Sequence, residues 1–322
     1  MEPPDLPDKP AASRSSAFRR RAMSTLVLWV IIAGALALQS SMLFAVVIVL
    51  IGTLAFIEFL GLLKLEGSPG WAGIRWGLTV LAACYLGAVA MHCKNSVIIS
   101  PEDSDSFLLL LTDSLCLPAV VIITTFLLLF HPINGNGTKD MFFGVVFGFV
   151  YTVILSSFLL RVLYIEGDYG NDYLIRKYGS GMGFSGQYYL LFLLVVTKFS
   201  DMGGYIVGSL IGRHKMIPHI SPGKTWEGFT FGCLVFSVAG GCAVYALFGE
   251  HMPLLNWTHV IILGFLLGIL AVVGDLAESI VKRCLARKDS GQVLPGIGGV
   301  LDLVDSILFT APVLFLYLIA LS

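Results

Sequence analysis

The sequence has few charged residues. Asp, Glu, Lys and Arg make up 13% of its 322 residues, whereas a soluble globular protein carries about 25%. So few charges cannot cover a water-facing surface, and hydrophobic residues make up 57% of the chain. The composition therefore predicts a polytopic membrane protein and excludes disordered and collagen-like chains.

Cysteine pairs and a basic excess are also missing. The six cysteines are scattered and form no C-x-x-C pair, which argues against a disulfide framework and against a zinc site. The 20 Lys and Arg residues are balanced by 21 Asp and Glu residues. Without a basic excess, we expect no nucleic-acid partner.

Long apolar runs dominate the chain instead. A membrane-spanning helix needs about 20 mostly apolar residues, and we predict an all-α fold with about nine such helices. Their ranges are 24–39, 42–63, 72–91, 107–130, 141–163, 187–211, 228–248, 258–281 and 304–321. Only Gln39-Ser40-Ser41 separates the first two, so one long kinked helix is the alternative there. We find no internal repeat, which argues against an inverted-repeat transporter.

The basic residues predict the orientation. Most Lys and Arg residues fall in segments that share one side of the membrane when the N-terminus is cytoplasmic, as the positive-inside rule requires. The loops 212–227 and 282–303 are then cytoplasmic, and the C-terminus lies outside. Arg19-Arg20-Arg21, an apolar stretch and Ala35-Leu36-Ala37 also fit a cleaved signal peptide. An uncleaved first span is simpler, because long apolar segments follow at once.

Ionisable residues within the spans indicate function by default, because a charge in the bilayer is unfavourable. In the N-terminal half, Glu58 and Asp113 are isolated, and we expect each to be neutral or to pair helices. In the C-terminal half, Lys198 and Asp201 lie three residues apart in the sixth predicted span. The chemistry is therefore expected in the C-terminal half.

Two further groups of carboxylates lie near the predicted cytoplasmic surface. One face of the eighth predicted helix carries two carboxylates, a hydroxyl and an ammonium group, from Asp275, Glu278, Ser279 and Lys282. Asp302 and Asp305 share a face at the start of the ninth. The alternatives are a solvated helix end for the first group and N-terminal capping for Asp302.

The loop between these two helices has the composition of a phosphate site. Its basic residues Lys282, Arg283, Arg287 and Lys288 precede a Gly-rich stretch over 295–299. Glycines let backbone N–H groups close on an anion, and carboxylates hold Mg²⁺, whose other ligands are phosphate oxygens. Oxygen ligands without His or Cys favour Mg²⁺ or Mn²⁺ over zinc. We predict a metal-dependent phosphate site; the alternative is a positive-inside loop that contains Gly.

The loop 213–227 is a second candidate for a phosphate site. Lys224-Thr225 invites comparison with a P-loop, but Pro218 stands where the first Gly is required and no strand precedes it. We therefore reject the P-loop. We predict instead that Ser221 caps a helix running through Trp226, whose first turn would bind an anion.

The residues of these segments resemble the phosphatidate cytidylyltransferase (CDP-diacylglycerol synthase) family. Four segments match in the family's order: Asp201 to Gly208 resembles D-x-x-[AG]-Y-x-x-G, Ser221 to Gly228 resembles S-P-x-K-T-W-E-G, Gly274 to Ser279 resembles G-D-x-x-E-S, and Ser279 to Asp305 resembles the C-terminal signature. The matches cover about 187–306. Residues 1–186 carry no comparable motif.

Two positions depart from the family's pattern. Ile297 stands where the family usually has His, and Leu303 where it usually has Arg. The carboxylates are all present, so the resemblance implies that metal binding survives. The departures instead affect how the phosphate or the lipid headgroup is held, and hence rate or substrate preference.

The resemblance implies that CTP and phosphatidate give CDP-diacylglycerol and pyrophosphate, with one or two Mg²⁺ ions for which Mn²⁺ could substitute. The implied metal ligands are Asp201, Asp275, Glu278, Asp302 and Asp305, and the implied catalytic residues are Asp275, Lys282, Asp302 and Asp305. The implied substrate-binding residues are Ser221, Lys224, Thr225, Arg283, Lys288, Gly298 and Gly299. The implied partners are CTP, phosphatidate, membrane lipid and a second copy of the chain in a homodimer.

We divide the chain into a cytoplasmic tail (1–23), an N-terminal transmembrane region (24–186) and a C-terminal catalytic transmembrane region (187–322). A bacterial cytoplasmic membrane is the expected location. One alternative function is a CTP-dependent polyprenol or lipid kinase, which would release CDP in place of pyrophosphate. The other is a secondary transporter with Lys198, Asp201 and Asp275 along an ion path.

Overall fold

A computed structural model of the chain describes residues 29–63, 71–95, 118, 120–125, 136–165, 186–285, 291 and 299–321. Within these ranges, seven helices are long and apolar enough to cross a membrane. They are Ser41–Leu62, Gly73–Lys94, Met141–Leu163, Gln187–Ile211, Gly228–His251, Trp257–Cys284 and Leu301–Leu321. The predicted all-α polytopic membrane protein is confirmed at this level. The first and fourth predicted spans lie partly outside the described residues, so the count of nine stays a prediction, as does the orientation.

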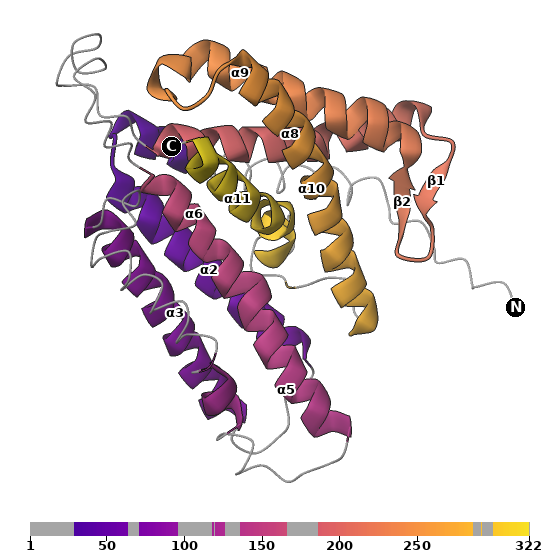
Figure 1. Ribbon diagram of the computed structural model, residues 1–322. Coiled ribbons are helices and arrows are strands. Elements are labelled where there is room, and N and C mark those ends of the chain that lie inside the picture. The colour runs from indigo at the N-terminus through magenta and orange to yellow at the C-terminus, as the bar shows by residue number, and fades with distance from the viewer. Residues whose placement is uncertain are drawn as a thin grey trace, which may run out of the picture.

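The helices of the N-terminal region lie together (Figure 1). They are α2 (Ser41–Leu62), α3 (Trp71–Asn95), and a continuous helix made of α5 (Asn136–Gly148), the π-helical segment η1 (Phe149–Ile154) and α6 (Leu155–Leu163). A helical segment over 29–37 precedes α2. Gln39 has a φ of 46°, and Ser40 caps α2 by accepting the Leu43 N–H at 3.3 Å. The single kinked helix is therefore wrong at this position.

The described part of the C-terminal region contains four α-helices and a hairpin. The helices are α8 (Gln187–Ile211), α9 (Val235–Phe248), α10 (Trp257–Cys284) and α11 (Leu301–Leu321), with a 3₁₀ turn η3 (Gly249–His251) after α9. The π-helical segment η2 (Gly228–Leu234) leads into α9. Figure 1 shows the hairpin at the end of α8, beside α10.

The hairpin replaces the helix that we predicted for this loop. Strand β1 (Lys215–Ile217) pairs antiparallel with β2 (Ser221–Thr225). Ser221 is therefore a strand residue and caps no helix, because pairing with β1 satisfies its segment of backbone. The helix begins later, and the Thr225 hydroxyl accepts the Gly228 N–H at 3.2 Å. The capping role falls to Thr225, so the predicted helix start at Ser221 is wrong, and anion binding by this loop stays a prediction.

Glycines bring α8 and η2 into backbone contact. A Cβ atom added at Gly203 or Gly232 would collide with the other segment, and one at Gly208 would lie 3.2 Å from the Thr225 hydroxyl. Small residues allow this close approach between membrane helices. The glycines that follow Asp201 in its motif therefore hold the start of η2 against α8, which places Asp201 next to the hairpin.

The N- and C-terminal regions pack against each other through α2, η1 and α11. A cluster of buried apolar side chains joins them, including Phe59, Tyr151, Leu301 and Leu308. Glu58 of α2 lies beside this cluster, and only 6% of its surface is exposed. The N-terminal region therefore supports the start of α11 directly. The domain boundaries themselves stay a prediction, and residues 1–23 lie outside the described part.

Candidate active site

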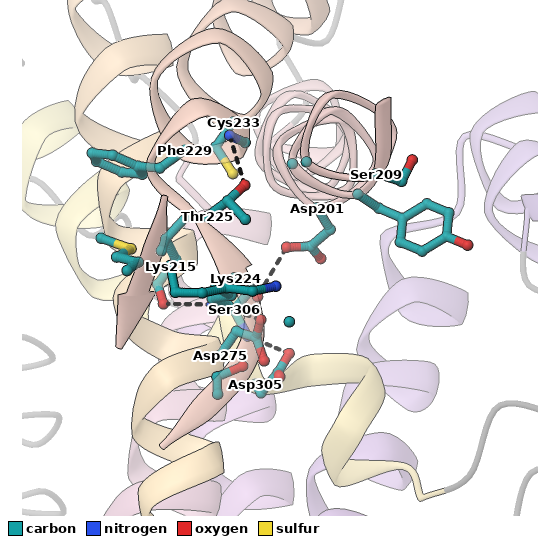
Figure 2. Close-up of a pocket in the computed structure, with 18 of the residues that line it drawn as sticks. Asp201, Ser209, Lys215, Lys224, Thr225, Phe229, Cys233, Asp275, Asp305 and Ser306 are labelled. Atoms are coloured by element: carbon teal, nitrogen blue, oxygen red, sulfur yellow. Dashed lines mark hydrogen bonds and ion pairs between the residues drawn. The ribbon is translucent and has the colours of Figure 1, made fainter. Parts of the chain in front are cut away.

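A polar cavity of ≈ 600 Å³ lies between the hairpin, α8, α10 and the start of α11. Its walls include most of the described residues that the sequence predicted, namely Asp201, Ser221, Lys224, Thr225, Asp275, Asp302 and Asp305. Figure 2 shows Lys224 lying across this cavity, between Asp201 and the pair Asp275 and Asp305. The cavity brings α10 and the start of α11 to α8 and to the hairpin that follows α8 in the sequence.

Three carboxylates from α10 and α11 come together at the cavity. Asp275, Glu278 and Asp305 each offer an oxygen, and these oxygens all lie within 4.8 Å of one another. The contact is close because Gly274 packs directly on the backbone of α11, where an added Cβ would lie 2.7 Å from the Asp305 carbonyl oxygen. The face of α10 that carries Asp275 and Glu278 therefore packs against the face of α11 that carries Asp305.

The donor set fits a hard divalent cation. Glu278 is 1% exposed and Asp305 5% exposed, and Oε1 of Glu278 has no hydrogen-bond partner among the described residues. A buried carboxylate oxygen without a partner is unfavourable unless a ligand satisfies it. An all-oxygen set is the kind that Mg²⁺ and Mn²⁺ prefer. The residues therefore suit the metal that the sequence predicted.

Lysines balance part of this negative charge. Lys224 Nζ lies 2.7 Å from Asp275, and Lys282 Nζ lies 2.6 Å from Glu278 and 3.0 Å from Asp302. In the same region, Lys198 Nζ lies 3.2 Å from an Asp201 oxygen. The five carboxylates thus face three ammonium groups, which leaves two negative charges when all are ionised. That excess equals the charge of one divalent cation.

Asp302 combines the two roles that the sequence left open. Its Oδ2 accepts the Gly299 N–H at 2.9 Å, so it does fix the start of α11. Its other oxygen pairs with Lys282, and the residue lines the cavity. Among the described residues, Asp302 does not belong to the set of three mutually close ligands.

The predicted substrate-binding residues divide into two groups. Ser221 and Lys224 line the cavity, and Lys224 also donates to the Val272 carbonyl at 3.2 Å. Arg283 instead contacts the Ile220 carbonyl of the hairpin at 3.4 Å. Thr225 lines the cavity while its hydroxyl holds the Gly228 N–H. Lys288 and Gly298 lie outside the described residues.

Glu227 closes the base of the hairpin. Its carboxylate accepts the backbone N–H groups of Arg213 and His214, and the His214 ring Nδ1 lies 2.5 Å from Oε1. The hydrogen bond to the His214 ring, with the backbone N–H groups, lowers the pKa of Glu227 to about 2. Glu227 therefore stays ionised at neutral pH and holds Arg213 and His214, at the start of the hairpin, close to the end of β2.

Comparison with known proteins agrees with this geometry. A family model described as "Cytidylyltransferase family" matches residues 19–321. The chain belongs to the cytidylyltransferase family. It is 40% identical over 161 residues to a phosphatidate cytidylyltransferase of Staphylococcus haemolyticus, covering 50% of this chain and 58% of that one. It is 37% identical over 184 residues to one of Mycobacterium bovis, covering 56% and 51% respectively.

A protein of Escherichia coli called uncharacterized protein YnbB is 40% identical over 133 residues, which cover 41% of this chain and 43% of that protein. The chain therefore spans about half the length of the curated relatives that it matches. Membership of the cytidylyltransferase family is shown by the family model, which covers nearly the whole chain.

Two residues beside the cytidylyltransferase cavity were not assigned to the site from the sequence. The sequence grouped Lys198 with Asp201 in the sixth predicted span but gave it no role in the predicted chemistry, and the structure shows it lining a neighbouring cavity with Asp201 and Asp302. Glu58 was expected to be neutral or to pair helices, and it does join α2 to α11: its Oε2 accepts the Leu301 N–H at 2.9 Å. The only signal for Glu58 was an ionisable side chain within an apolar span, whereas Lys198 also had Asp201 three positions away.

Glu58 is expected to position the start of α11. Glu58→Leu removes the acceptor for the Leu301 N–H, so Asp302 and Asp305 should lose their fixed placement and the Mg²⁺ concentration for half-maximal activity should rise about tenfold. Glu58→Gln retains an acceptor oxygen and should stay within about threefold of the wild type. Ser156→Ala, another buried polar change in the N-terminal region, is the control. An unchanged Mg²⁺ requirement in Glu58→Leu would contradict this role.

Proposed function

We propose that this protein is a phosphatidate cytidylyltransferase. An oxygen of the phosphatidate phosphate attacks the α-phosphorus of CTP, a new P–O bond forms, and pyrophosphate leaves as CDP-diacylglycerol is produced. The observation that supports this best is the set of three close carboxylates opposite Lys224 and Lys282. The curated relatives that carry this name support the choice of substrates.

The reaction needs positioning and charge neutralisation more than a strong base. A phosphate monoester is already anionic near neutral pH, so its oxygen needs little activation. Lys224, projecting from the hairpin into the cavity, is placed to neutralise phosphate charge, and Ser221 beside it offers a hydroxyl donor. Fixed charges in a site that excludes bulk water stabilise the developing charge of a phosphoryl-type transition state.

Asp275, Glu278 and Asp305 would hold Mg²⁺, for which Mn²⁺ could substitute. The ion would neutralise phosphate charge and orient the reacting groups. Asp201 and Asp302 are the further candidates if a second cation binds, because both line the same cavity. Lys282 keeps the Glu278 and Asp302 carboxylates oriented through its two ion pairs.

The proposal also includes the membrane, the side from which each substrate enters, and the oligomeric state. The hairpin that lines the cavity belongs to the loop 212–227, which the basic residues predict to be cytoplasmic. CTP would enter from the cytoplasm, and phosphatidate from the lipid. A bacterial cytoplasmic membrane and a homodimer remain part of the proposal.

The test is an assay of purified protein in detergent with phosphatidate, radiolabelled CTP and Mg²⁺. We expect a labelled lipid and pyrophosphate, and we expect EDTA to abolish both, with recovery on addition of excess Mg²⁺. Release of CDP with a phosphorylated lipid would support the lipid kinase instead. No nucleotide chemistry with any lipid phosphate, together with ion flux in liposomes, would support the transporter.

A further inference from the structure

A second cavity of ≈ 470 Å³ adjoins the polar one and differs in chemistry. Its walls are apolar side chains from the segment 29–37, α2, α6, α8 and α11, including Trp29, Ile48, Leu194 and Ile307. Three of its lining residues are ionisable, and these are Lys198, Asp201 and Asp302. Its volume falls within the roughly 300–1,000 Å³ of small-molecule sites.

The two cavities meet at shared residues. Asp201 and Asp302 line both of them. A molecule with an anionic head and an apolar tail could therefore occupy both at once, with the head towards the three close carboxylates and lysines and the tail among the apolar side chains. A lipid phosphate has this form, whereas CTP has no apolar part.

Lys198 lies beside Asp201, where the two cavities meet, and it has an N–H donor available for a ligand. Its ammonium group has three N–H donors. Among the described residues, one contacts Asp201 at 3.2 Å and one the Leu303 carbonyl at 2.8 Å. The third is left for a ligand, and the side chain is 27% exposed. Within the described part of the chain, no other Lys or Arg lines the apolar cavity.

Position 303 adds a second reason. The family that the motifs resemble usually has Arg there, and this chain has Leu303, whose side chain lines the apolar cavity. Lys198 reaches the backbone of that same residue from α8. Lys198 therefore places a cation from α8 beside Leu303, at the start of α11.

We propose that Lys198 and the apolar cavity form the lipid subsite of this protein, with Lys198 binding the phosphate of a phosphatidate-like lipid and the apolar cavity an acyl chain. The inference rests on the proposed function for the identity of the lipid. It assigns the ends of the substrate to particular residues of this chain, and it predicts separate effects on headgroup affinity and on chain-length preference.

Headgroup affinity is tested with Lys198→Met, which keeps the length of the stem and removes the charge. A charge-assisted hydrogen bond to an anion is lost, so the KM for phosphatidate in mixed micelles should rise about 10- to 100-fold. The KM for CTP should stay within about twofold. Lys198→Arg should lie close to the wild type. A rise in the KM for CTP with no change for phosphatidate would overturn the assignment.

The double variant Lys198→Met with Leu303→Arg tests the replacement of one cation by another. Arg at 303 would return a positive charge to the same end of the apolar cavity. We expect it to recover most of the lost phosphatidate affinity. No recovery would overturn the view that a cation at this end of the cavity is what holds the lipid phosphate.

Chain-length preference is tested with Leu194→Trp, which fills part of the apolar cavity. Each CH₂ excluded from an apolar site costs about fourfold in affinity. The preference for 16-carbon over 8-carbon phosphatidate, measured as a ratio of kcat/KM, should fall about tenfold. Leu247→Trp on the exposed face of α9 is the matched control, since Leu247 is 75% exposed. Equal ratios in the two variants would overturn the proposal.

Retention of lipid by the purified protein separates this inference from the proposed function. Native mass spectrometry would compare phosphatidate with diacylglycerol on the wild type and on Lys198→Met. If the wild type lacks activity, the proposed function fails, yet selective retention of phosphatidate that is lost in Lys198→Met still supports the subsite. Equal retention by both proteins overturns the subsite, whatever the activity.

Discussion

Asp275→Asn is expected to lower turnover by at least about 10³-fold while the protein still inserts and purifies. The substitution keeps the shape of the side chain and removes the charge that pairs with Lys224 at 2.7 Å. It also removes one anionic oxygen from the set shared with Glu278 and Asp305. Electrostatic groups aimed at a developing charge are among the largest contributors to catalysis.

The measurement is the rate of CDP-diacylglycerol formation at saturating CTP and Mg²⁺. Glu250→Gln is the matched control, because Glu250 is an exposed carboxylate on the η3 turn, which follows α9 away from the cavity. Activity close to the wild type in Asp275→Asn would show that the three close carboxylates are not the metal site.

Asp305→Asn should have a similar effect, and the double variant should be hardly worse than either single one. Residues that act as a unit have strongly non-additive effects on rate. Two independent losses that multiply would mean that Asp275 and Asp305 serve separate steps. The comparison therefore tests whether Asp275 and Asp305 act in the same metal site, whatever the number of ions bound there.

The spans were predictable because their signal is local. A run of about 20 apolar residues specifies a membrane helix without reference to the rest of the chain, and 141–163 and 187–211 were predicted with the bounds that the structure has. Spacing within one helix was equally informative. Asp275 and Glu278 lie three positions apart, and that spacing placed both on the face that meets α11.

The hairpin was not predictable in this way. Its strands are three and five residues long, and Ser221-Pro222-Gly223-Lys224-Thr225 shows no alternation of apolar and polar residues. Its pairing is supported by Glu227, which accepts N–H groups from the start of the hairpin, 13 and 14 residues earlier in the chain. Hydrogen bonds between residues this far apart cannot be predicted from a stretch of sequence as short as one strand.

Glu58 and Lys198 show that contacts between distant residues were also not predictable at the site. Glu58 meets its partner Leu301 across 243 positions, and Lys198 meets Leu303 across 105. In the sequence, Glu58 is an isolated charge in an apolar run, and Lys198 has only Asp201 near it. Only the packing of α2 and α8 against the start of α11 shows that both side chains act on the backbone of one helix turn, the turn that carries Asp302 and Asp305.

That helix turn also depends on Lys282, and Lys282→Met is expected to lower the free energy of unfolding by about 3–5 kcal/mol. The Lys282 side chain is 17% exposed and pairs with Glu278, whose side chain is 2% exposed. Removing the ammonium group leaves a buried carboxylate without its cation, which is strongly destabilising. Thermal and denaturant unfolding in detergent would measure the loss, and turnover should fall as well.

A second substitution separates stability from catalysis. Lys282→Met with Glu278→Gln removes both charges of the buried pair, and replacing both partners usually restores most of what breaking the pair loses. The double variant should therefore recover most of the stability lost in Lys282→Met, apart from the part that the Lys282–Asp302 pair contributes, yet it should stay inactive because Glu278 is one of the three close carboxylates. If the double variant is less stable than Lys282→Met alone, the ion pair is not what Lys282 contributes to the fold. If it recovers activity, Glu278 is not part of the metal site.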